Sequence, residues 1–283
     1  MRPSNPAEAS AGSRPGNTPE DPANRIAPGH ARDRFAEEGF VWLEPSPASL
    51  DWAGAAWDAA APRVADPAWR SQWLRCDGTW FTGVDLLPNA PDGSVGGQPL
   101  PVPDLVGELG LTHAAWHAGQ VSVTYPGYPR PKEGESPGAA RYRMTRDAAH
   151  VDGLLPEGTP ARRFLREPHA FILGIALTDS APDASPLVVW PGSHRTMGAA
   201  FRTARAPHPG PAGTLDLTEE YAAARRAVFA SHTRTVVPLR RGAMILLHRH
   251  LLHGIAPWRA GADDAGRAIA YFRPQLEDLE RWF

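Results

Sequence analysis

The side chains best able to do chemistry lie in two short segments that are far apart in the sequence. His150 and Asp152 form the first segment, and His253 followed by Gly254 ends the second. Residues at positions i and i+2 of a strand point to the same face, so His150 and Asp152 could hold one ion without bending the backbone. Two imidazoles and one carboxylate leave other metal positions open, which is typical of a mononuclear Fe(II) centre that reacts with dioxygen.

This pattern needs support from the rest of the chain. A His-x-Asp pair arises readily by chance in a chain with 11 histidines, and alone it would be interpreted as a solvated loop pair. The distal ligand also has three candidates from residue type, which are His248, His250 and His253.

The order of five segments provides that support. The chain resembles the phytanoyl-CoA dioxygenase-like (PhyH) family of Fe(II)/2-oxoglutarate oxygenases through residues 35–43, 150–152, 187–194, 241–254 and 266–271. The most specific pieces are the Pro-Gly-Ser-His turn that ends at His194, the His-Gly pair and the strand that begins at Arg267. The resemblance covers residues 30–275 and implies that His150, Asp152 and His253 are the metal ligands. In the same pattern His194 is expected to be structural.

The resemblance also implies a site for the 2-oxoglutarate carboxylate. Lys132 is the only lysine, so an arginine is expected to bind this carboxylate. Arg267 is the candidate, because an inward-facing guanidinium can form a two-pronged pair with a carboxylate. Arg259, in a loop, is the competitor. Tyr125 could donate its hydroxyl to the same carboxylate or could simply pack. Alternation along 267–273 places Arg267, Ile269, Tyr271 and Arg273 on one face.

The function implied by this resemblance is an oxidation at carbon. The family uses Fe(II) as cofactor and 2-oxoglutarate and O2 as co-substrates, hydroxylates an unactivated C–H bond, and releases succinate and CO2. The carboxylate of Asp152 favours hydroxylation over halogenation, since related halogenases lack it. Two alternatives remain open: a metal-binding cupin-type isomerase or 2-oxoglutarate-independent dioxygenase, which would not need Arg267, and a catalytically silent binding protein.

The substrate is expected to be a small, anionic or polar metabolite. Arg143 and Arg146 precede the ligand segment and could bind an anionic group. The Pro- and Gly-rich loop 126–138 lies between a strand and this segment, where it could close over the site as a lid. The chain departs from the family at Ile255, where many relatives carry a polar residue, and at Gly174, where some carry a tryptophan near the co-substrate.

The fold expected from these patterns is mainly β with flanking helices, built on a double-stranded β-helix, that is, a cupin-like jelly roll. Alternating or apolar runs predict strands at 40–43, 120–125, 170–177 and 267–273. Helices are expected over 30–38, 50–75 and 218–230, and a long loop over 84–104. Residues 1–28 are predicted to be a disordered arm, and 29–283 one domain with a helical insertion at 196–235.

Composition excludes several classes of protein. The net charge of −2 gives no reason to expect nucleic acid or a membrane surface as partner. No apolar run approaches the length of a membrane span, and the N-terminus lacks the apolar stretch of a secretory signal. The single Cys76 cannot form an internal disulfide, which suits the reducing cytoplasm. The oligomeric state is not indicated.

Overall fold

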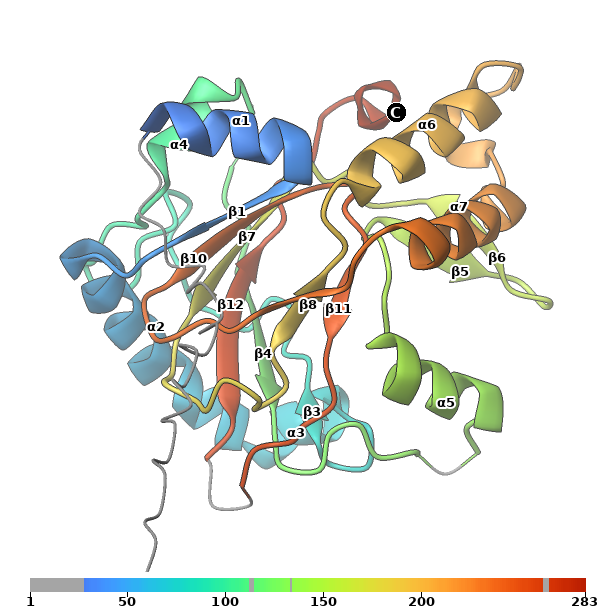
Figure 1. The fold of residues 1–283 in the computed structure, drawn as a ribbon. Helices are drawn as coiled ribbons and strands as arrows, with labels where there is room; N and C mark the ends of the chain where they lie inside the picture. Colours follow the sequence, from blue (N-terminus) through green and yellow to red (C-terminus); the bar gives the residue numbers. More distant parts are fainter. Residues whose placement is uncertain (1–27, 112–114, 133, 262–264) are drawn as a thin grey trace, which may run out of the picture.

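A computed structural model describes residues 28–111, 115–132, 134–261 and 265–283 (Figure 1). The predicted disordered arm, residues 1–28, lies outside the described residues except for Pro28, which begins the first helix. The jelly-roll class expected from the sequence is confirmed. Two antiparallel sheets face each other, and helices cover their outer sides.

The larger sheet has seven strands in the order β1-β10-β7-β12-β4-β3-β2. Their bounds are β1 Phe40–Leu43, β2 Leu74–Arg75, β3 Trp80–Phe81, β4 Gln120–Thr124, β7 Phe171–Ala176, β10 Met244–His248 and β12 Arg267–Phe272. The strands expected at 40–43, 120–125, 170–177 and 267–273 are all present within a residue or two of their ends. β12 lies between β7 and β4, and its residues are all buried.

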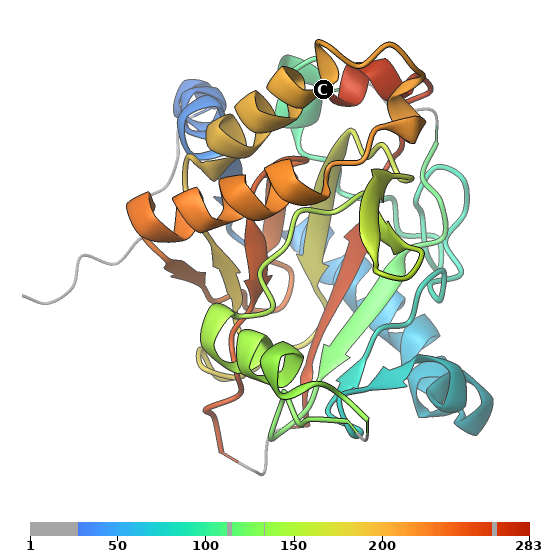
Figure 2. The same ribbon diagram turned by 90° about the vertical axis from the view of Figure 1, so that its right-hand side faces the viewer.

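The smaller sheet has three strands in the order β11-β8-β9, with bounds β8 Leu187–Val189, β9 Thr235–Val237 and β11 His253–Ile255. A separate hairpin of β5 Leu154–Glu157 and β6 Arg162–Leu165 lies beside it (Figure 2). One buried apolar cluster fills the space between the two sheets and includes Ile172, Val189 and Ile269. The expected alternation along β12 is therefore present, since Ile269 and Tyr271 join this cluster while Ala270 faces the other side.

Three helices lie near the outer face of the larger sheet: α1 Pro28–Glu38, α2 Pro47–Ala65 and α3 Pro67–Trp73. Helix α2 begins at a capping box in which the Ser46 hydroxyl accepts a hydrogen bond from the Ser49 N–H. Its Trp52 is completely buried and contacts Phe272 with 5.9 Å between ring centroids. The short α4, Asp104–Glu108, follows a stretch that holds no named strand or helix, as expected for residues 84–104.

On the other side of the molecule lie α5 Pro137–Arg146, α6 Ser193–Arg205 and α7 Thr218–Ser231, with short 3-10 turns at Ala212–Thr214 and Leu279–Trp282 (Figure 2). Helices α6 and α7 pack together over a second buried cluster that includes Trp190. Helix α7 matches the helix expected at 218–230. Helix α5 and the β5–β6 hairpin were not expected.

The missed helix α5 has a local cause. The Pro- and Gly-rich composition of 126–138 indicated a loop, yet the helix begins at Pro137 inside that segment. The Ser136 hydroxyl accepts a hydrogen bond from the Ala139 N–H, and Pro137 occupies the first turn, where a missing N–H costs nothing. Among the described residues, no helix combines the length and the apolar character needed to cross a bilayer.

Candidate metal and co-substrate site

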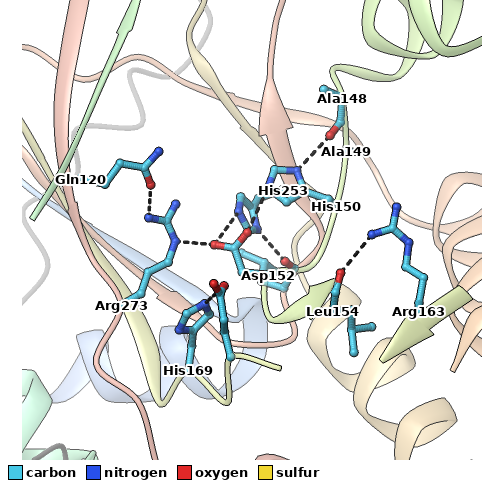
Figure 3. Close-up of polar contacts among 12 residues, drawn as sticks. Gln120, Ala148, Ala149, His150, Asp152, Leu154, Arg163, His169, His253 and Arg273 are labelled. Atoms are coloured by element: carbon cyan, nitrogen blue, oxygen red, sulfur yellow. Dashed lines mark hydrogen bonds and ion pairs between the residues drawn. The ribbon is translucent and has the colours of Figure 1, made fainter. Parts of the chain in front are cut away.

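The structure brings His150, Asp152 and His253 together at one point (Figure 3). One ligand atom from each residue lies within 4.8 Å of the others, and no other such group of histidine, cysteine or carboxylate side chains occurs in the described part of the chain. The His150 Nε2 lies 3.0 Å from Asp152 Oδ1, and the His253 Nε2 lies 3.9 Å from Asp152 Oδ2. Two imidazole nitrogens and a carboxylate at this spacing fit an Fe(II) ion, although their role as ligands stays a prediction.

The two ligand segments are joined by a pair of backbone hydrogen bonds. The His150 N–H donates to the His253 carbonyl at 2.8 Å, and the His253 N–H donates to the His150 carbonyl at 3.0 Å. His150 is therefore not on a regular strand, as the spacing argument assumed, but in an isolated bridge beside β11. The local geometry still alternates, because Val151 is buried in the cluster under α6 and α7 while its two neighbours face the site.

Gly254 allows this close approach. A Cβ atom at position 254 would lie 2.2 Å from the Asp147 carbonyl oxygen and 3.1 Å from the Ala149 Cα. The same carbonyl of Asp147 accepts a hydrogen bond from the Ile255 N–H at 2.8 Å. The glycine of the His-Gly pair is thus needed so that the backbone before His150 can lie against β11.

An ion pair that the sequence did not reveal holds the backbone before His150. The Asp147 carboxylate is buried and accepts two hydrogen bonds from Arg234, both 2.7 Å long. Asp147 has a φ of 53°, a left-handed conformation that aspartate tolerates better than most residues. The two-pronged pair connects the end of α5 to the segment before β9.

Gly153 allows a similarly close backbone contact after Asp152. Its φ is +92°, and a Cβ there would lie 2.4 Å from the Glu167 carbonyl oxygen. The Gly153 carbonyl accepts a hydrogen bond from the Arg166 N–H at 2.9 Å. The turn that carries Asp152 is therefore fixed against the chain leading into β7.

Both histidine rings are oriented so that Nε2 faces the site. The Nδ1 of His150 lies 2.9 Å from the Ala148 carbonyl, and that of His253 lies 2.9 Å from the Leu251 carbonyl. A carbonyl partner fixes the proton on Nδ1 and leaves Nε2 free to bind a metal. Burial and the neighbouring His150 lower the pKa of His253 to about 4, so this ring is neutral at neutral pH.

The charge of Asp152 is stabilised by its surroundings. Burial raises the pKa of this carboxyl, but Arg273, together with the hydrogen bond from His150, lowers it more, and the net shift is well below the usual value. The Arg273 Nε donates to Asp152 Oδ2 at 2.6 Å, and its Nη1 donates to the Gln120 side-chain carbonyl. Sequence reasoning placed Arg273 on the inward face of its strand but gave it no contact with a ligand.

Arg267 is buried on the same face of β12, with 3 % of its surface exposed. Its Nε and Nη2 have no hydrogen-bond partner, and the same is true of the buried hydroxyl of Thr124, which lies opposite on β4. Burial lowers the pKa of Arg267, and a hydrogen bond with Tyr271 opposes this shift in part. A buried guanidinium with unsatisfied donors fits an anion such as a carboxylate, because otherwise these donors stay desolvated without compensation.

Tyr125, the second residue expected to bind the 2-oxoglutarate carboxylate, does not lie beside Arg267 on the inward face. The inward side chains of β4 are Gln120 and Ser122, which line the cavity, so Tyr125 points to the outer side. Its ring packs against the outer core and lies 5.8 Å from the Arg70 guanidinium. Tyr128 lines the cavity instead; burial raises its pKa, and the charge of Arg267 acts on it in the opposite direction.

The expected substrate arginines are also elsewhere. Arg143 forms an ion pair with Glu135, and Arg146 stacks on Phe229 with 4.7 Å between its guanidinium carbon and the ring centroid. Neither lines the cavity. Arg259, the competitor of Arg267, is exposed in its loop.

The other two candidate distal histidines form a separate buried group. The ring of His248 lies 4.9 Å from that of His194 and 5.3 Å from that of His250, measured between centroids. Burial lowers the pKa of His194 to about 4 and that of His248 to about 3, so both rings are neutral. Their position agrees with the expectation that His194 is structural.

The metal cluster opens into a cavity of about 710 Å³. Its wall contains the aromatic side chains of Trp80, Trp116 and Tyr271 and the polar side chains of Gln120, Glu167, His169, Arg273 and Gln275. Tyr271 occupies the space that the family's tryptophan would need, since a Cβ at Gly174 would lie 2.9 Å from its ring. Ile255, the second departure from the family, also lines the cavity.

Comparison with known proteins supports the interpretation of this site. Residues 132–261, which include all three cluster residues, match the family described as Phytanoyl-CoA dioxygenase (PhyH). The chain is therefore similar over these residues to a family of non-haem iron- and 2-oxoglutarate-dependent oxygenases, in agreement with the resemblance of its motifs.

Several solved structures are similar in shape. AviO1 from Streptomyces viridochromogenes Tue57 is 17% identical, with 88% of this chain and 96% of that chain covered and a TM-score of 0.48. The 2-oxoglutarate-dependent carbocyclase SnoK from nogalamycin biosynthesis is 17% identical over 90% and 91%, with a TM-score of 0.45. EctD from S. alaskensis, solved with 2-oxoglutarate and 5-hydroxyectoine, is 16% identical over 90% and 79%, with a TM-score of 0.46. No curated protein matches the chain.

Proposed function

We propose that this oxygenase hydroxylates an unactivated C–H bond of a small polar metabolite, with Fe(II) held by His150, Asp152 and His253. The observation that carries the proposal is the convergence of these three side chains within 4.8 Å at the wall of a cavity. Bound iron, 2-oxoglutarate and O2 supply the oxidising power, and 2-oxoglutarate leaves as succinate and CO2. The protein orients the reactants and excludes water.

Arg267 is proposed to bind the distal carboxylate of 2-oxoglutarate. Two of its nitrogens and the Thr124 hydroxyl are buried without partners, and the hydroxyl of Tyr128 is in the same region. A carboxylate placed there would accept hydrogen bonds from these donors and would offset the buried positive charge. Tyr128 thereby takes the role that the sequence suggested for Tyr125.

The substrate would occupy the rest of the cavity. Arg143 and Arg146 do not line the cavity. Its wall contains the carboxylates of Asp85 and Glu167, and its one lining arginine, Arg273, is already paired with Asp152. This wall favours a neutral polar or a basic substrate over the anionic one first expected. Tyr128 lines the cavity and belongs to the loop expected at 126–138, which supports the proposal that this loop closes over the substrate.

The two alternatives are less well supported. A cupin-type isomerase or a 2-oxoglutarate-independent dioxygenase has no need of a buried, partly unpaired arginine, yet Arg267 is present and its burial lowers its pKa. A silent binding protein has no need of three converging ligand side chains.

The test is Fe(II)-dependent formation of succinate from 2-oxoglutarate, measured with and without a panel of basic, neutral and anionic metabolites. We expect substrate-stimulated turnover in the unmodified protein, none in Asp152→Ala, and a raised 2-oxoglutarate requirement in Arg267→Met. Arg259→Met, which removes an exposed loop arginine, is the matched control and should behave like the parent. Turnover that is independent of 2-oxoglutarate would instead support the cupin-type alternative.

A further inference from the structure

Arg273 joins the metal cluster to the rest of the cavity wall. It follows β12 on the same face as Arg267, and about a fifth of its side chain is exposed to the cavity. Its guanidinium donates through Nε to Asp152 and through Nη1 to Gln120 (Figure 3). It is the only arginine that lines the cavity within the described part of the chain.

The two oxygens of Asp152 have different partners. Oδ1 lies 3.0 Å from the His150 Nε2, which is the atom that would bind a metal. Oδ2 accepts the Arg273 hydrogen bond at 2.6 Å, a short, charge-assisted contact. A metal ion bound between His150 and His253 would therefore meet one oxygen that is free to turn toward it and one that is already held.

The position of Arg273 does not depend on Asp152 alone. Its guanidinium carbon lies 5.1 Å from the centroid of the Tyr271 ring, and its backbone N–H donates to the His117 Nε2 at 2.8 Å. Gln120, in turn, donates to the Thr82 carbonyl at 2.8 Å. These contacts would keep the guanidinium in place while the carboxylate exchanges its histidine neighbour for an ion.

We propose that Arg273 is a positioning residue that holds Asp152 by its Oδ2 and so presents Oδ1 for metal binding. This inference rests on the proposed function. The short, charge-assisted hydrogen bond orders the carboxylate before a metal binds. Without Arg273, the metal itself would have to order this side chain, and its affinity would be lower.

The test measures metal and co-substrate binding directly, without turnover. Titration calorimetry gives the affinity of the metal-free protein for Mn(II), which is redox-stable, and then the affinity of the Mn(II)-loaded protein for 2-oxoglutarate. In Arg273→Met we expect Mn(II) affinity to fall about 10–100-fold, the usual effect of losing a partner behind a metal ligand. Arg273→Lys keeps the positive charge but cannot donate to Asp152 and Gln120 through one planar group, so it should recover part of the lost Mn(II) affinity. Gln120→Leu should lower the affinity in the same direction but less.

Arg205→Met is the matched control, because Arg205 makes a similar fork to Glu280 far from the cluster. It should leave Mn(II) affinity unchanged. Equal or tighter Mn(II) binding by folded Arg273→Met would overturn the proposal, and tighter binding would show that Arg273 competes with the ion. If Arg273→Met does not fold, Arg273→Lys and Gln120→Leu decide, and unchanged affinity in both overturns it. Failure of the unmodified protein to bind Mn(II) would reject the proposed function itself.

Discussion

Replacement of Gly254 by alanine is expected to destabilise the protein and to separate the two ligand segments. The added Cβ would lie 2.2 Å from the Asp147 carbonyl oxygen, whereas ordinary contacts begin at 3.4 Å, so one backbone must move by about 1.2 Å (3.4 − 2.2). Neither neighbour can give way easily, because the atoms met are backbone atoms of Asp147 and Ala149.

Three hydrogen bonds cross this contact and would be lost or weakened by such a shift. They are the two between His150 and His253 and the one from Ile255 to Asp147, with lengths of 2.8 to 3.0 Å. At about 0.5–1.5 kcal/mol each, their loss lowers the free energy of unfolding by roughly 1.5–4.5 kcal/mol. The His150 ring would move with its backbone, so metal affinity should fall as well.

Urea unfolding and Mn(II) calorimetry measure the two effects. Gly138→Ala is the control, because a Cβ there meets nothing within 4 Å and alanine favours the helix by up to about 1 kcal/mol. We expect Gly138→Ala to be as stable as the parent or more so, with the same metal affinity. If Gly254→Ala unfolds at the parental urea concentration and binds Mn(II) as tightly, the close approach at Gly254 is not required and the reasoning is refuted.

Three further outcomes are expected. Arg267→Met should weaken 2-oxoglutarate binding to the Mn(II)-loaded protein about 10–150-fold, which corresponds to the loss of a charged hydrogen-bond pair, while Tyr125→Phe leaves this affinity unchanged. A larger loss of affinity in Tyr125→Phe than in Arg267→Met would show that Arg267 does not bind the co-substrate carboxylate. Arg234→Met should cost about 1–3 kcal/mol in urea unfolding, since it strips the buried Asp147 of both donors. Burial lowers the pKa of His248 to about 3, so the stability that its neutral ring contributes should be full above pH 6.5 and should fall as the pH drops toward 3. In His248→Phe the free energy of unfolding should fall less steeply over this pH range. An identical pH profile in the parent and the variant would contradict the burial argument.

The sequence revealed most about residues that act through local spacing. His150 and Asp152 face one side because they are two positions apart, and that holds even though a single bridge replaces the expected strand. The inward face of β12 followed from the same alternation. Applied to β4, alternation would also have placed Tyr125 on the outer side, since Gln120 and Ser122 line the cavity.

Contacts between distant segments could not be predicted from the sequence. Arg234 meets Asp147 and Arg273 meets Asp152 because the sheets fold them together, and one sequence with 29 basic residues gives no means to choose among its many arginines. Arg143 and Arg146 were chosen for their nearness in the chain to His150. The helix that carries them turns Arg143 toward Glu135 and Arg146 toward Phe229.

Arg267 begins β12 and Arg273 directly follows its last residue, so this strand sets the distance between the two guanidinium groups. Six steps of extended chain separate their backbones by about 20 Å. Insertion or deletion of one residue between them would turn one guanidinium to the outer side, so this segment cannot change length by single steps during evolution.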